Sequence, residues 1–257
     1  IYTQYNDQIR ISEVSKAWLN NEIEDAEAFA LQCMRFWRKS PYRRVLNDFN
    51  YFKFVLQVLL ALEKKQKVLS YPQFILTLFS DNGDVEEFLS LIENNNFRHD
   101  IDQMYKFIVN QYSLIDENHS KVNKQSTVCN DYGNTVFRVL QLTGLISINS
   151  KTGILTMSIN EFKRELLEKL LKTEFSISED AKEDELLYFN EIGYFDKSLK
   201  EIIVSSREKE QESVEDYNST MSALIEEYGI TEDLLKNWII ALSNNKNDAS
   251  SFWYIQK

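Results

Sequence analysis

A glycine between an amphipathic stretch and two short alternating segments constrains this fold more than any other feature. Apolar residues at three- and four-residue steps predict a helix that begins at Ser126 and ends beside Gly144, because glycine suits the position after a helix. The two alternating segments that follow flank the polar turn 149–153, a pattern typical of a β-hairpin. A helix followed by a hairpin indicates a winged helix, which we expect to end near Ile159.

The predicted helix has an apolar face and a polar face. The apolar face is expected to be buried and comprises Val128, Tyr132, Val136, Phe137 and Leu140. The polar face also includes Asp131 and Gln141. The candidate DNA-binding residues on this face or just before it are Lys121, Asn123, Lys124, Gln125, Ser126, Thr127, Asn130, Asn134 and Arg138. In the major groove Asn and Gln pair with adenine and Arg with guanine, while Lys and the helix N-terminus hold phosphate. An ordinary surface helix has the same face, and winged helices also bind proteins, so both alternatives stay open.

Composition predicts a mainly α fold in a reducing compartment. Only six glycines and two prolines occur in 257 residues. Since these residues form many of the tight turns between strands, their scarcity argues against a sheet-rich fold. The two cysteines, Cys33 and Cys129, are far apart and form no metal-binding motif, so we expect core residues. No apolar run is long enough to span a membrane, and the chain opens without a signal peptide. We therefore expect a cytoplasmic protein without a membrane partner.

The net charge of −11 argues against nucleic acid, but the charge is unevenly distributed. Residues 1–150 hold 16 basic and 18 acidic side chains, whereas residues 151–257 hold 13 and 22. A DNA-facing surface in the first part is therefore allowed. A basic cluster interleaved with aromatic residues is a second candidate for phosphate contact, and a solvated helix end is an equal alternative: Arg35, Arg38, Lys39, Arg43 and Arg44.

Hydrophobic periodicity and caps predict further elements. A strand running directly into a helix is expected in QIRISEVSKAWLNN, and the helix 24–37 has Ala26, Phe29, Ala30, Cys33, Phe36 and Trp37 at helical spacing. Further helices are predicted over 50–67, from the cap Ser70 to Phe79, from the cap Asp84 to Glu93, and over 160–172, 197–228 and 231–242. The helix 197–228 is so polar in its middle that it must bridge two lobes or be widely solvated.

No catalytic motif is present. His99 and His119 stand alone in polar segments, without partners at metal-ligand spacing. The chain contains no P-loop, nucleotide fingerprint, nucleophile elbow or HExxH. The sequence therefore predicts neither a catalytic site nor a metal site within these residues.

Six segments match, in order, the pattern of a known family: QIRISEVSKAWLNN, EAFALQCMRFWRKSPY, FVLQVLLALEKK with LSYPQFILTLF, NDYGNTVFRVLQLTGLISI, ELLYFNEIGYFDKSL and SSFWYIQK. They resemble the recognition and linker region of the AlwI family of type IIS restriction endonucleases, which includes site-specific nicking enzymes. The fourth segment resembles the family's recognition helix with its R-x-x-x-x-T-G-L entry into the wing. A Pro-x-x-Leu-Glu stretch that follows the last segment in the family is missing here.

The resemblance implies a division of the chain. Residues 1–44 would end a first winged-helix subdomain, 45–172 would form a second that recognises double-stranded DNA, and 173–257 would be an acidic helical linker. A C-terminal nuclease domain of the same protein would hydrolyse phosphodiesters with Mg²⁺, as a monomer or with a second nuclease subunit. Since Ile1 is not Met and the chain stops on FWYIQK, we expect the natural protein to extend at both ends.

Two alternatives remain from different classes. A tandem winged-helix transcription regulator or replication initiator would bind DNA and cleave nothing. A helical scaffold whose winged helix binds protein would not bind DNA at all.

Overall fold

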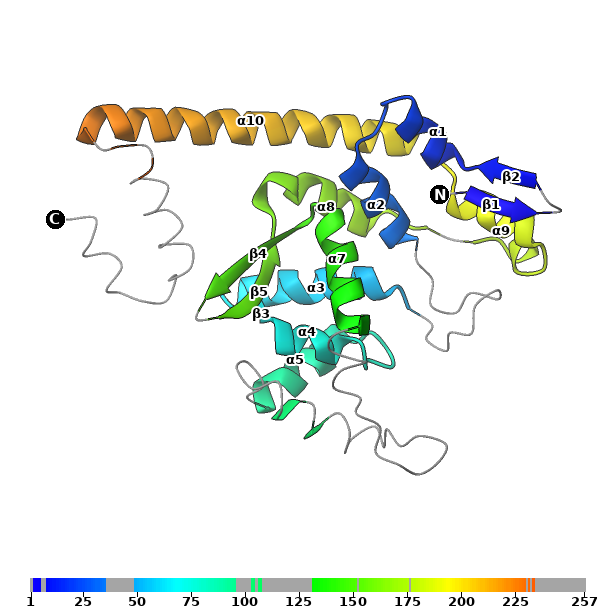
Figure 1. The fold of residues 1–257 in the computed structure, drawn as a ribbon, viewed down its shortest axis with the longest axis horizontal. Helices are drawn as coiled ribbons and strands as arrows, with labels where there is room; N and C mark the ends of the chain where they lie inside the picture. The colour runs from blue at the N-terminus through cyan, green and yellow to red at the C-terminus, as the bar shows by residue number, and fades with distance from the viewer. Residues whose placement is uncertain are drawn as a thin grey trace.

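The structure is a computed structural model of the chain, and it describes residues 2–5, 8–35, 49–95, 103–104, 106–107, 131–151, 153–175, 177–229, 231 and 233. Helices dominate these residues, whose strands form one two-stranded and one three-stranded sheet. The prediction of a mainly α fold is confirmed. Figure 1 shows a body of short helices and one small sheet beside a single long helix, α10 (Lys197–Tyr228), which extends beyond the body at one end.

The N-terminal elements are a hairpin and two helices. β1 (Tyr2–Tyr5) pairs antiparallel with β2 (Gln8–Ile11), and α1 (Glu13–Leu19) and α2 (Asp25–Met34) follow. Ser12 separates β2 from α1, and its hydroxyl caps the first turn of α1 by accepting a backbone hydrogen bond. The predicted strand leading directly into a helix is confirmed.

The helix α3 (Tyr51–Lys64) lies at the centre of the core, and its buried residues include Phe54, Val55, Leu56, Val58, Leu59 and Leu62. Asn50 begins this helix by accepting a hydrogen bond from the Lys53 N–H at 2.9 Å. The Asn50 amide also donates to the carbonyl oxygens of Cys33 and Met34, at 3.0 and 2.6 Å. One side chain therefore joins the end of α2 to the start of α3.

The three-stranded sheet brings together segments far apart in the chain. β3 (Leu69–Ser70) pairs with β5 (Ile154–Ile159), which also pairs with β4 (Ile146–Lys151), so the strand order is β3-β5-β4 and every pair is antiparallel. The predicted hairpin is confirmed, with longer strands and a shorter connection than expected. Gly153 lies in this connection with a positive φ of 80°, a conformation that glycine adopts without a steric cost.

Two capped helices follow β3. α4 (Tyr71–Thr77) begins at Ser70, whose hydroxyl and backbone form a capping box with Gln73. α5 (Val85–Asn94) begins at Asp84, whose carboxylate accepts a backbone hydrogen bond from the first turn. Both caps were predicted from the sequence and are confirmed.

The helix α7 (Asn134–Leu142) precedes the hairpin, as the sequence predicts, and Gly144 follows it with a φ of 67°. Phe137 and Leu140 are buried, but Tyr132 is 63% exposed, so its prediction as a core residue was wrong. Residues 131–133 wind as a π-helical turn, which is wider than an α-turn and rotates Tyr132 off the apolar face. The predicted start of the helix at Ser126, and Val128, lie outside the described residues.

The chain after the sheet is helical. The 3₁₀ turn η2 (Glu161–Lys163) leads into α8 (Arg164–Lys172), which confirms the helix predicted over 160–172. A second 3₁₀ turn, η3 (Asp180–Lys182), precedes α9 (Glu185–Ile192), and α9 leads through a short connection into α10.

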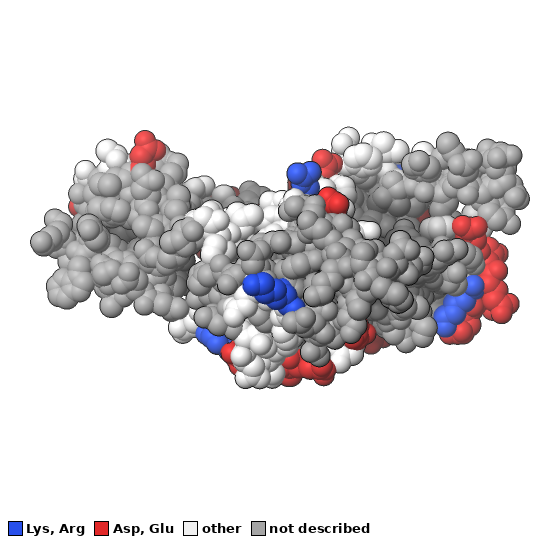
Figure 2. Space-filling view, turned by 60° about the horizontal axis from the view of Figure 1, so that its bottom comes forward, with Lys and Arg blue, Asp and Glu red and all other residues white. Residues whose placement is uncertain are grey.

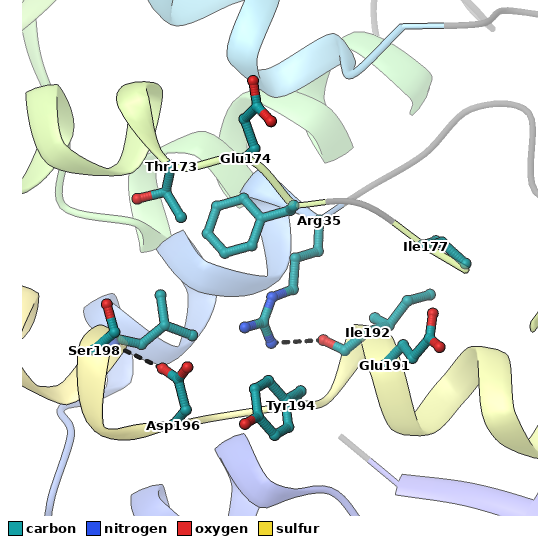
Figure 3. Close-up of a pocket in the computed structure, with 11 residues that line it drawn as sticks. Arg35, Thr173, Glu174, Ile177, Glu191, Ile192, Tyr194, Asp196 and Ser198 are labelled. Atoms are coloured by element: carbon teal, nitrogen blue, oxygen red, sulfur yellow. Dashed lines mark hydrogen bonds between the residues drawn. The ribbon is translucent and has the colours of Figure 1, made fainter.

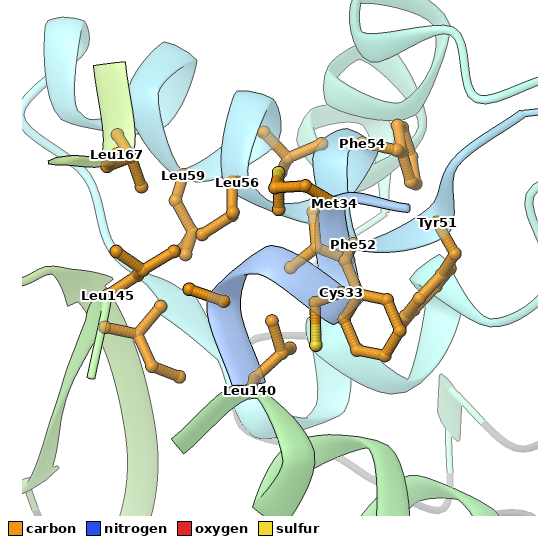
Figure 4. Packing of buried hydrophobic residues seen from close by; sticks show 14 of the residues in the cluster. Cys33, Met34, Tyr51, Phe52, Phe54, Leu56, Leu59, Leu140, Leu145 and Leu167 are labelled. Atoms are coloured by element: carbon orange, nitrogen blue, oxygen red, sulfur yellow. The ribbon is translucent and has the colours of Figure 1, made fainter. Parts of the chain in front are cut away.

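Figure 4 shows how distant segments share one core. Cys33 from α2, Leu140 from α7, Leu145 before β4 and Leu167 from α8 are all at most 4% exposed. Cys33 is thus a core residue, as predicted, and burial raises the pKa of its thiol to about 12. Cys129 lies outside the described residues.

Several contacts between segments far apart in sequence fix α10 to the body, among them an ion pair and a pair of rings. Arg207 of α10 donates to the carboxylate of Glu27 in α2, which is only 2% exposed. Farther along, the rings of Phe162 in η2 and Tyr217 in α10 pack edge to face, with centroids 6.2 Å apart. Residues 211–220 are nevertheless all exposed, which confirms that the middle of this helix is widely solvated.

The helix predicted from Glu24 onward is confirmed over Asp25–Met34, although its buried side differs from the apolar positions that indicated it. The predicted apolar stripe includes Phe29, which is 41% exposed, whereas Glu27 is buried. Glu27 lies on the same side of α2 as the buried Leu31 and Met34, and there its carboxylate meets Arg207. The predicted residues Phe36 and Trp37 lie outside the described residues, as does the helix predicted over 231–242 apart from Thr231 and Asp233.

Candidate nucleic-acid interface

The outward surface of α7 carries a row of polar side chains. Asn134, Arg138 and Gln141 are all exposed and follow one another at steps of four and three residues. The same spacing places them on one side of the helix, which borders the side that carries the buried Phe137 and Leu140. The structure therefore confirms that the predicted polar residues within α7 share one solvent-facing surface.

Aromatic packing fixes the direction in which this surface faces. The Phe137 ring packs edge to face on Tyr71 and Phe74 of α4, with centroid distances of 5.5 and 5.8 Å. Leu140 is 1% exposed and lies in the shared core. Since the buried side of α7 is held by α4 and the core, the polar side has little freedom to rotate away from solvent.

Two exposed residues extend the same surface. Asp131 lies in the π-helical turn before α7, and the Thr135 hydroxyl donates to the Asp131 carbonyl oxygen at 2.7 Å. Asp131 was predicted to lie on the polar face, whereas Thr135 was not. The four-residue step between the two would have indicated that Thr135 lies beside it.

Most of the predicted DNA-binding residues lie outside the described residues: Lys121, Asn123, Lys124, Gln125, Ser126, Thr127, Asn130, Arg38, Lys39, Arg43 and Arg44. The structure therefore brings together Asn134 and Arg138 among the candidates. The proximity of the others to α7 stays a prediction.

Arg35 corrects the interpretation of the basic cluster as an exposed surface. It is 4% exposed, donates to the Ile192 carbonyl oxygen at 2.8 Å, and lies with its guanidinium carbon 5.0 Å from the centre of the Phe175 ring. Burial lowers the pKa of the Arg35 guanidinium to about 10, and the Asp196 carboxylate partly offsets this effect. Arg35 therefore connects the end of α2 to the α9–α10 corner and presents no surface to a phosphate backbone.

Arg35 also lines a cavity of about 220 Å³ between α2, α9 and α10, shown in Figure 3. Two of the carboxylates that line the cavity accept hydrogen bonds within the α9–α10 corner. Glu191 accepts from the backbone and hydroxyl of Ser178, and Asp196 accepts from the Leu199 N–H at the start of α10. The polar groups around this cavity thus hold the α9–α10 corner together.

The charge of the described surface is mixed. On the face shown in Figure 2, the blue side chains of the described residues lie apart from one another, and the residues drawn in colour form no continuous basic patch there. Within the described ranges Arg138 has no ion-pair partner, so its guanidinium is available to a ligand. The α7 surface therefore offers specific hydrogen-bonding groups and little net positive charge.

The described residues do not fit a metal centre. Among them, no three His, Cys, Asp or Glu side chains lie close enough to one another to hold an ion. The helices of the same ranges include none with the length and apolar character that a bilayer crossing requires.

Comparison with known families identifies the chain. The sequence profile described as AlwI restriction endonuclease matches residues 1–248, nearly the whole chain. The chain belongs to the AlwI restriction endonuclease family. None of the curated proteins matches it significantly in sequence. Membership in the AlwI family confirms the resemblance found in the six sequence segments and implies DNA as a partner.

Proposed function

We propose that this member of the AlwI family recognises a specific sequence in double-stranded DNA through a winged helix made of α3, β3, α4, α7, β4 and β5. The strand order β3-β5-β4 carries this proposal. In a winged helix a first strand after the first helix pairs with the returning strand of a C-terminal hairpin, and the helix before the hairpin reads DNA. Here α5 and residues 95–130 are inserted between the second helix, α4, and the recognition helix, α7.

The exposed chemistry of α7 suits base edges in the major groove. Arg138 can donate two hydrogen bonds to guanine O6 and N7, and Asn134 can pair with adenine N6 and N7. Gln141 offers the same amide chemistry as Asn134, one turn beyond Arg138. The β4–β5 hairpin is the wing, which contacts the DNA backbone or the minor groove.

The domain organisation follows from the same assignment. Residues 1–44 end a first winged-helix subdomain, 45–172 form the second, and 173–257 connect recognition to cleavage. The solvated middle of α10 supports this connecting role, because residues 211–220 are all exposed.

Cleavage belongs to a nuclease domain in which Mg²⁺ supplies an activated water for phosphodiester hydrolysis. The described residues do not fit such a site, so no catalytic step is assigned to them. The proposed parent enzyme is a cytoplasmic, type IIS or nicking endonuclease that acts as a monomer or with a second nuclease subunit. The family match favours this role over a transcription regulator or a protein-binding scaffold.

Random-site selection on duplex DNA tests the proposal. We expect the chain to enrich one motif, to bind more weakly as salt rises, and to lose ~1 to 3 kcal/mol of specific binding in Arg138→Ala and in Asn134→Ala. Lys197→Ala, a charge removal at the exposed start of α10, is the matched control and should leave the motif unchanged. Absence of any enriched motif would refute DNA recognition, and unchanged affinity in both α7 variants would move recognition to another surface.

A further inference from the structure

The recognition surface of α7 includes an acidic side chain, which is unusual for a surface that faces phosphates. Asp131 is exposed at the N-terminal end of the surface, and it has no ion-pair partner among the described residues. With Arg138 it leaves the surface without net charge. A carboxylate in this place repels the DNA backbone, and a hydrogen bond accepted from a base would offset that repulsion.

The major groove offers one exposed group that suits a carboxylate. The N4 amine of cytosine is a hydrogen-bond donor there, and Asp and Glu are the side chains that accept from it. We propose that Asp131 accepts a hydrogen bond from the N4 amine of a cytosine in the recognised sequence and thereby selects that base. This inference rests on the proposed function, because it requires α7 to lie in the major groove.

The position of Asp131 supports a base contact. In helix-turn-helix proteins the N-terminal residues of the recognition helix contact base edges, and Asp131 lies at that end of α7. Its backbone is fixed by the Thr135 hydroxyl, which donates to the Asp131 carbonyl oxygen and leaves the carboxylate free to reach outward.

The spacing along α7 predicts the order of the bases. Asp131 precedes Arg138 by seven residues, which corresponds to about 10 Å along a helix axis. Base pairs are about 3.4 Å apart along the DNA axis, so the cytosine lies about three base pairs from the guanine read by Arg138. Asn134 falls between the two, which places an adenine between them.

Base-preference measurements separate this contact from a structural role. Random-site selection is carried out with the wild type, Asp131→Ala, Asp131→Asn and Arg138→Ala. The wild type should enrich cytosine about three base pairs from the guanine whose preference disappears in Arg138→Ala. In Asp131→Ala the preference for cytosine over the other bases should fall about tenfold at that position and stay unchanged at the others. The affinity of this variant for random duplex DNA should rise.

A carboxylate that merely stabilises the first turn of α7 gives a different result. Asp131→Ala would then lower the melting temperature and leave the base preference unchanged, which overturns the inference. Glu226→Ala removes the same charge from the exposed far part of α10 and should not change any base preference. Asp131→Asn keeps the shape of the side chain, so it tests the contact even where Asp131→Ala folds poorly.

A modified base provides an independent test of the contact between Asp131 and cytosine. Replacing the selected cytosine by 2-pyrimidinone removes the N4 amine, and it should weaken the wild type about tenfold but leave Asp131→Ala unaffected. Equal losses in both proteins would overturn the contact. If the wild type enriches no motif at all, both the proposed function and the Asp131 contact are refuted. If Asp131→Ala retains the whole motif of the wild type, only the Asp131 contact is refuted.

Discussion

Replacing Arg207 by Met tests whether one buried ion pair holds α10 to α2. Glu27 is 2% exposed, and its carboxylate accepts hydrogen bonds from the Arg207 Nε at 2.7 Å, from the Arg207 Nη2, and from the Glu24 N–H at 2.8 Å. Arg207→Met would leave this carboxylate buried with a single backbone donor.

The loss of unfolding free energy expected in Arg207→Met follows from the burial of the two partners. Removing one partner of a buried pair costs about 3 to 5 kcal/mol, because the other charge stays desolvated. The Arg207 side chain is 33% exposed, so water reaches it in part and the lower end, about 3 kcal/mol, applies. Replacing both residues, with Glu27→Leu added to Arg207→Met, removes the stranded charge and should cost only about 1 kcal/mol.

Urea unfolding followed by circular dichroism measures the loss of unfolding free energy in the single variant and in the double variant. Lys209→Met is the matched control, because Lys209 lies on the same helix but pairs with Glu212 at the surface, with side chains 60% and 63% exposed. Its free energy of unfolding should change by less than about 0.5 kcal/mol. A loss below about 1 kcal/mol in Arg207→Met, or an equal loss in the double variant, would refute the account of a buried and mutually compensating pair.

Two further predictions concern ionisable groups. The Cys33 thiol, whose pKa burial raises to about 12, should stay unreactive toward a thiol reagent at pH 8 until urea unfolds the chain, and rapid labelling of the native protein would contradict its place in the core. The pKa of Glu22 is lowered by the hydrogen bond and charge of Lys200, so this pair stabilises the fold above the ordinary pKa of Glu22 and the stabilisation is lost as the pH falls through the lowered value. A carboxyl titration followed by NMR should show the lowered value return toward normal in Lys200→Met, and an unchanged titration would exclude the contact.

Local signals predicted much of the fold. The helix 197–228 and the hairpin before Ile159 were found because periodicity, caps and a glycine mark their ends within a few residues. The caps Ser70 and Asp84 are likewise local, since each bonds a backbone group three residues away.

The errors arose where distant segments decide the structure. β3 is only two residues long and exists because Leu69 pairs with Met157, so no local pattern indicates it. Glu27 is buried against Arg207, which lies 180 residues later, so no residue near Glu27 in the sequence indicates its burial. Arg35 looked like part of a basic surface because the Ile192 carbonyl that it bonds is supplied by α9, 157 residues later.

At the candidate site, the sequence was sufficient to predict the polar surface of α7 but not the structure of the turn that precedes this helix. The three- and four-residue spacing is sufficient to place Asn134 and Arg138 on one side. The π-helical turn before α7 depends on how the preceding chain enters the helix, so the exposure of Tyr132 could not be read from spacing alone.

The anchoring of α10 has a mechanical consequence. A helix of 32 residues is about 48 Å long, so a tilt of about 5° at its first turns moves its far end by about 4 Å. That displacement exceeds the step of about 3.4 Å between neighbouring base pairs. The accuracy with which anything carried at the far end meets a given nucleotide therefore depends on how stiffly the contacts along α10 hold it, among them Glu27 with Arg207, Lys163 with Glu210 and Phe162 with Tyr217, together with the buried Leu199 and Ile203.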